Sequence, residues 1–93
     1  MVIHLGANTP VRAETILLLC DLTMGLSADT AAMLEKMKQA GCVRTLDGAA
    51  KTLVLCQEGT RAMCYLTGVG LRTLRLRMDE ELRFTAAVWQ KGT

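Results

Sequence analysis

Short apolar runs separated by turn-forming residues dominate the start of the chain and predict strands. Residues 2–5 form the first run, the turn-forming segment 6–10 closes it, and the chain is extended again at 11–12. Residues 15–21 (TILLLCD) are apolar at consecutive positions, so they predict a second, largely buried strand.

A helical period follows. Ser27 suits the N-cap of a helix, Asp29 lies in the first turn where a negative charge is favourable, and Gly41 is a typical stop. Between them, apolar or weakly polar side chains recur on one side of the helix. This stripe consists of Thr30, Met33, Leu34 and Met37. We therefore predict a helix between Ser27 and Gly41.

The second half of the chain returns to strand patterns. Residues 42–46 predict a strand that turns at 47–48. Residues 51–56 and 61–66 flank a turn at 57–60, which is the signature of a β-hairpin. Alternation places Leu53 and Leu55 on one face of the first strand. It places Ala62, Cys64 and Leu66 on one face of the second strand.

A second helix is predicted after the glycines that end the hairpin. Its apolar stripe consists of Leu71, Leu74, Met78, Leu82, Ala86 and Trp89. The element order becomes β-β-α-β-β-β-α, a small single α+β domain with antiparallel strands and two helices. We expect the domain to cover residues 1–83, and residues 84–93 to extend the last helix or form a tail.

Composition adds an expectation of self-association. The chain has 93 residues, 51% of them apolar, and only one Phe, one Trp and one Tyr. A domain of this size has a thin core, so surplus apolar surface is best covered by other copies of the chain. The longest strictly apolar run, Ile16 to Cys20, is far shorter than the roughly 20 residues of a membrane span.

The N-terminus lacks the pattern of a signal peptide, so we expect a cytoplasmic protein with free thiols. The four cysteines have no paired metal-ligand spacing and are expected to act as small buried apolar residues. They are Cys20, Cys42, Cys56 and Cys64. His4 is the single imidazole, expected either to face outward or to be a satisfied core residue. No catalytic motif is present, so we predict no enzyme, no metal and no cofactor.

Three arginines fall close together in the second predicted helix, at Arg72, Arg75 and Arg77. Such a helix can bind phosphates, because each neutralised phosphate releases counterions. The alternative is a solvated helix face neutralised by the acidic residues at 79–81. The net charge of +2 leaves both interpretations open.

Several segments, taken in order, resemble the bacterial extracellular-matrix (biofilm) regulator family RemA/RemB, and its RemB branch more closely. Residues 2–6 (VIHLG) are similar to the family's start, 11–16 to its strand–turn–strand step, and 51–55 (KTLVL) to a later strand. The closing segment 65–77 is similar through Thr67, Thr73, Leu74, Arg75 and Arg77. The resemblance runs from residue 1 to about residue 80.

The resemblance implies a non-enzymatic, cytoplasmic protein that forms homo-oligomeric rings, binds duplex DNA and regulates transcription of biofilm-matrix genes. The sequence departs from the family at two basic positions, where it has Thr15 and the uncharged Gly48-Ala49, with Lys51 still charged beside them. Gly68 also replaces a proline common in RemB-like chains.

We therefore expect DNA binding through other basic residues, repeated around the oligomer and contacting the phosphate backbone. These candidates are Arg12, Arg44, Lys51, Arg72, Arg75 and Arg77. The expected partners are duplex DNA and further copies of the chain, with no membrane and no small-molecule substrate. The alternative is an interaction scaffold of the same fold that does not bind nucleic acid. A thiol or small-molecule enzyme is a third possibility, which no motif supports.

Overall fold

The computed structural model describes residues 2–46 and 48–80. The main elements are, in order, β1 (Val2–His4), β2 (Pro10–Arg12), β3 (Ile16–Asp21), α1 (Ala28–Gln39), β4 (Val43–Thr45), β5 (Thr52–Glu58) and β6 (Arg61–Thr67). Two short 3-10 helices lie on either side of β3, at Ala13–Thr15 and Leu22–Met24. A second helix runs from residue 71 to the last described residue, 80, and is called helix 71–80 below.

The predicted α+β class with two helices is confirmed, but the expectation of purely antiparallel strands is wrong. The main sheet has the order β3-β5-β6-β4 and is mixed, because β4 pairs parallel to β6 while the other pairs are antiparallel. The cause is the crossover through α1. The helix carries the chain back along the sheet, so that β4 enters in the same direction as β3.

The N-terminal segment forms a small sheet of its own. Pro10–Arg12 pairs antiparallel with Val2–His4, so three strands precede α1 where the sequence predicted two. Three successive residues with positive φ make the turn between them, beginning with Gly6 at 96°. A side chain at Gly6 would also be tightly packed, because a Cβ there would lie 3.2 Å from Val69 Cγ2.

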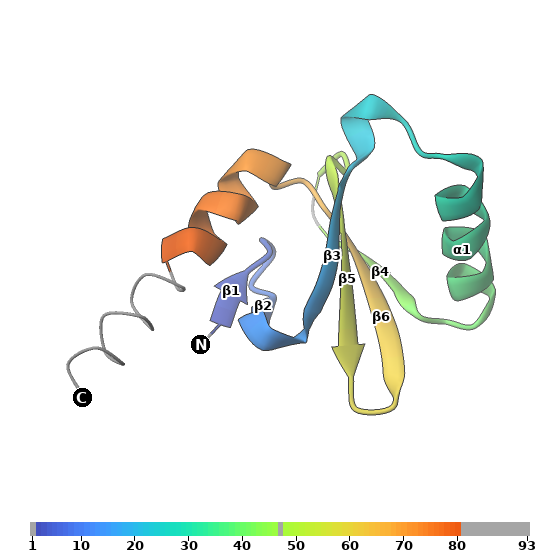
Figure 1. The fold of residues 1–93 in the computed structure, drawn as a ribbon, viewed down its shortest axis with the longest axis horizontal. Helices are drawn as coiled ribbons and strands as arrows, with labels where there is room; N and C mark the ends of the chain where they lie inside the picture. The colour runs from blue at the N-terminus through green and yellow to red at the C-terminus, as the bar shows by residue number, and fades with distance from the viewer. Residues whose placement is uncertain (1, 47, 81–93) are drawn as a thin grey trace.

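The main sheet is covered on both faces (Figure 1). α1 packs on one face, over the cluster of Leu53, Cys64 and Leu66. The β1–β2 hairpin and helix 71–80 cover the other face. The buried cluster there consists of Ile3, Leu5, Val11, Val54, Cys56, Tyr65 and Leu74. Alternation along the central strands β5 and β6 supplies both clusters, because successive side chains point to opposite faces. The hairpin pattern predicted the apolar face that includes Leu53, Cys64 and Leu66.

The predicted first helix is confirmed at both ends. The Ser27 hydroxyl accepts a hydrogen bond from the backbone N–H of Thr30 at 3.2 Å, and Gly41 takes a φ of 73° beyond the last turn. No residue of α1 is fully buried. Leu34 and Met37, from the predicted stripe, are half-buried against the sheet.

The predicted hairpin is confirmed with a shorter turn. β5 and β6 stay paired as far as Glu58 and Arg61, so the turn is Gly59-Thr60 instead of residues 57–60. Gly59 has a φ of 61°, the left-handed conformation that such tight turns require.

The expectation that residues 15–21 form a largely buried strand is wrong. β3 is an edge strand, and none of its residues is fully buried. Leu17 and Leu18 are 59% and 41% exposed. The apolar run belongs to a strand that the other described residues leave partly exposed. Its ladder to β5 is irregular between Ile16 and Leu18.

Helix 71–80 has the inward face that its spacing predicted. Leu74 is fully buried, and Leu71 and Met78 are half-buried. The rest of the predicted stripe, at Leu82, Ala86 and Trp89, lies outside the described residues, as does the expected extension at 84–93. Among the described residues, no helix is long and apolar enough to cross a membrane.

Candidate nucleic-acid interface

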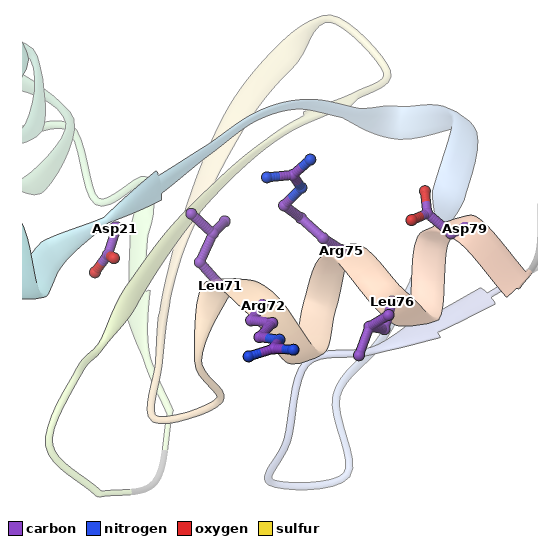
Figure 2. Close-up of a pocket in the computed structure, with 6 residues that line it drawn as sticks. All are labelled: Asp21, Leu71, Arg72, Arg75, Leu76 and Asp79. Carbon is purple, nitrogen blue, oxygen red and sulfur yellow. The ribbon is translucent and has the colours of Figure 1, made fainter.

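Two of the candidate arginines lie together in a shallow hollow of about 470 Å³ between helix 71–80 and the end of β3 (Figure 2). The side chains that line it are both apolar and charged. They are Asp21, Leu71, Arg72, Arg75, Leu76 and Asp79. Arg72 and Arg75 are both exposed, and carboxylates at each end of the hollow offset part of their charge.

The two guanidinium groups do not point the same way. The Arg75 side chain extends towards β3, whereas the Arg72 side chain extends away from it (Figure 2). Arg75 therefore also lines a second hollow, of about 480 Å³, together with Leu17, Leu18 and Met78. Arg72 is the better placed of the two to reach an extended polyanion outside the protein.

Arg77 has a structural contact instead. It lies two residues beyond Arg75, which is about 200° around a helix, and its Nη1 donates a hydrogen bond to the His4 carbonyl at 2.6 Å. The bond ties helix 71–80 to β1. His4 itself faces outward, the first of the two positions expected for it.

Arg12 is held in an exposed ion pair. Its Nη2 lies 2.7 Å from Glu14 Oε1, the one ion pair within residues 2–46 and 48–80. A backbone hydrogen bond and the Arg12 contact lower the pKa of Glu14. Exposed ion pairs contribute little to stability because solvent screens them, so a phosphate could compete for Arg12.

Arg44 and Lys51 come from different segments of the main sheet. Arg44 is exposed on β4, the edge of the sheet opposite β3, with its guanidinium carbon 5.8 Å from the centre of the Tyr65 ring. Lys51 is exposed just before β5 and lines a hollow of about 380 Å³ with the loop residues Gly6 and Gly48. Neither forms an ion pair with another described residue.

Of the six basic candidates, the structure brings Arg72 and Arg75 together in one hollow, whereas Arg12, Arg44 and Lys51 come from other parts of the chain and do not line that hollow. The sequence could have separated Arg75 from Arg77 by helical period alone. The hydrogen bond from Arg77 to the His4 carbonyl had no sequence signal, because 73 positions separate the two residues.

The cysteines are free, as predicted, but the expectation that all four are buried is wrong, because Cys20 and Cys42 are half-buried. Cys56 and Cys64 are buried, and burial raises the pKa of both thiols, that of Cys64 to about 11. Cys42 is half-buried, and its sulfur accepts a hydrogen bond from Arg61 Nη2 at 3.0 Å, a contact the sequence analysis missed. In the part of the chain that the structure describes, no three His, Cys, Asp or Glu side chains are grouped to hold a metal ion.

No protein-family model matches this chain, and no curated protein matches it significantly. The resemblance to the RemA/RemB family therefore rests on the sequence segments quoted above.

Proposed function

We propose that this chain is a non-enzymatic transcriptional regulator of the RemA/RemB type, which acts in the cytoplasm. Copies of the chain assemble, in a ring as in that family, and bind duplex DNA by gripping its phosphate backbone through arrayed Arg and Lys side chains. The family resemblance supports the biofilm-matrix role.

The observation that carries this proposal is the distribution of exposed cations. Arg44 on β4, Lys51 just before β5 and Arg72 on helix 71–80 are exposed, and none is ion-paired with another described residue. A single chain therefore offers DNA only a few such contacts. Repeating them around an oligomer turns weak single contacts into a multivalent surface.

The test is binding of labelled random duplex DNA to the wild-type protein, followed by fluorescence anisotropy at increasing salt. Affinity is expected to fall steeply with salt, since each phosphate contact releases counterions. The Arg72→Glu variant is expected to bind more weakly to every duplex sequence, because a phosphate contact carries no sequence information. Lys38→Glu is the matched control, with the same change of charge at an exposed position of α1, and is expected to bind like the wild type.

The second candidate is a self-assembling scaffold that does not bind nucleic acid. Two observations favour it, namely the carboxylates of Asp21 and Asp79 beside Arg72 and Arg75, and the uncharged Gly48-Ala49 segment next to Lys51. Absence of any anisotropy change at low salt and micromolar protein would reject the DNA-binding proposal and leave this candidate.

A further inference from the structure

The outer edge of β3 is unpaired within residues 2–46 and 48–80. The sheet order places β3 at one end, and no described strand pairs with its second side. Edge strands in monomeric proteins are usually protected by charged residues, prolines, β-bulges or a covering loop. The ladder of β3 to β5 is irregular between Ile16 and Leu18 but regular from Leu18 to Asp21. Residues 16–20 (ILLLC) include no charge and no proline, and Leu17 and Leu18 are 59% and 41% exposed. This edge is suited to pairing with another strand.

Helix 71–80 extends the same apolar surface. Leu71 and Met78 line the 480 Å³ hollow together with Leu17 and Leu18, so strand and helix present one continuous face. Leu76, on the same helix, is 56% exposed. We call the surface formed by Leu17, Leu18, Leu71 and Met78 the β3 face.

The β3 face carries charges of both signs. Arg75 and Asp79 both line its hollow, one helical turn apart, and they do not form an ion pair with each other. β3 runs towards Asp21, while helix 71–80 runs in the opposite sense, from Leu71 beside Asp21 to Asp79 at the other end (Figure 2). A two-fold axis that crosses the β3 face between Arg75 and Asp79 would bring Arg75 of each chain towards Asp79 of the other chain.

We infer that the β3 face binds a second copy of this chain in a two-fold symmetric contact, with the two β3 strands antiparallel and Arg75 paired to the second copy's Asp79. This deepens the proposed function and rests on it, since it names the surface that starts the assembly. A copy of the chain fits better than an acidic or a basic partner, because this face offers both signs in a self-complementary arrangement.

The other open edge, β4, is a poorer partner for β3. It has three residues, and Arg44 and Thr45 are exposed on it. Pairing β3 with β4 of a neighbour would leave Leu17 and Leu18 against a short polar strand. A two-fold contact joins only two chains. A ring would therefore be built from dimers held by the β3 face, joined through a second contact elsewhere on each chain.

The first test is the mass of the protein in solution, measured by sedimentation velocity without DNA. Leu18→Lys places a charge in the β3 face and is expected to lower the average mass at equal concentration. Met24→Lys is the matched control, because Met24 is 83% exposed but does not line either hollow beside helix 71–80. It should keep the wild-type mass. Circular dichroism verifies that each variant is folded.

The decisive test uses charge exchange between chains. Asp79→Arg and Arg75→Asp each place like charges opposite one another in a homodimer, so each variant alone is expected to have a lower mass than the wild type. An equimolar mixture restores both Arg–Asp pairs in a mixed dimer, so the mass is expected to recover on mixing. A pair made within one helix could not produce that recovery.

The inference is overturned if both Asp79→Arg and Arg75→Asp keep the wild-type mass. It is also overturned if both variants are folded and their mixture does not regain the wild-type mass. These outcomes differ from failure of the proposed function. If the mass recovers on mixing while the wild-type protein does not change the anisotropy of labelled DNA, the β3 contact is supported and DNA binding is rejected. If the wild-type protein sediments as a single chain yet binds DNA, both the β3 contact and the proposed oligomeric array of cations are rejected.

Discussion

The Tyr65 hydroxyl donates a hydrogen bond to Glu58 Oε1 at 2.5 Å, linking the middle of β6 to the end of β5. Burial of the ring and the neighbouring carboxylate both disfavour the phenolate, and together they raise the pKa of Tyr65 to about 12 from its ordinary value of 10. Arg44 above the ring opposes this shift weakly.

Since Tyr65 is the only tyrosine, its ionisation can be followed by ultraviolet absorbance. We expect a midpoint near 12 in the folded protein and near 10 after unfolding in denaturant. The folded pKa lies above the unfolded pKa, so this contribution to stability is complete below pH 10 and is lost as the pH rises towards 12.

Replacing the carboxylate should lower that midpoint. Glu58→Gln removes the negative charge beside the hydroxyl, so the pKa of Tyr65 is expected to fall towards 10. Glu35→Gln removes a carboxylate from an exposed position of α1 and should leave the midpoint unchanged. A Tyr65 midpoint that is equal in both variants would show that Glu58 does not act on the phenol.

Leu74 should be the side chain that attaches helix 71–80 to the core. It is fully buried in the cluster with Ile3, Leu5 and Tyr65. Leu74→Ala is expected to lower the free energy of unfolding by about 2–5 kcal/mol, from lost burial and the cavity left behind. Leu76→Ala, at a 56% exposed position of the same helix, should change it by less than about 0.5 kcal/mol. Urea denaturation measures both, and equal losses would contradict this packing.

Gly6 should be less tolerant of a side chain than Gly41, although both have positive φ, at 96° and 73°. Gly41→Ala adds backbone strain after α1, where nothing lies within 4 Å of the added Cβ, and should cost about 1–2 kcal/mol. Gly6→Ala adds a tight contact with Val69 Cγ2 at 3.2 Å, so its loss of stability should be larger. Thermal denaturation that ranks the two variants the other way would contradict the turn geometry.

The four thiols should fall into two classes towards a disulfide reagent. Cys20 and Cys42 are half-buried and are expected to react in the native protein. Cys56 and Cys64 are buried with raised pKa values, so they should react only as the protein unfolds. The reaction is followed by absorbance at neutral pH, with urea-unfolded protein as the reference for four accessible thiols. If all four thiols react at one rate in the native protein, the burial of Cys56 and Cys64 is contradicted.

The sequence predicted those parts of the fold that local chemistry determines. Helix α1 begins after Ser27 because its hydroxyl caps the first turn, and the β5–β6 hairpin turns at Gly59 because a positive φ is needed there. Both signals lie within a few residues of the structure they produce.

The errors concern long-range pairing. An apolar run such as ILLLC in β3 is compatible with a central strand or with an edge strand. Only the sheet order shows that β3 is at the edge, where Leu17 and Leu18 are exposed. The parallel direction of β4 depends on the α1 crossover, which no local pattern specifies. In the candidate site, the spacing grouped Arg72, Arg75 and Arg77, whereas the packing of helix 71–80 points Arg77 to β1 and Arg75 to β3.

The central claim is that copies of this chain cover one another's apolar surface and thereby array its positive charge. Sedimentation equilibrium of the wild-type protein, without DNA and over a wide range of concentration, tests it most directly. We predict an average mass that is a multiple of the single-chain mass and that falls on dilution. The mass of a single chain at every concentration would contradict the account.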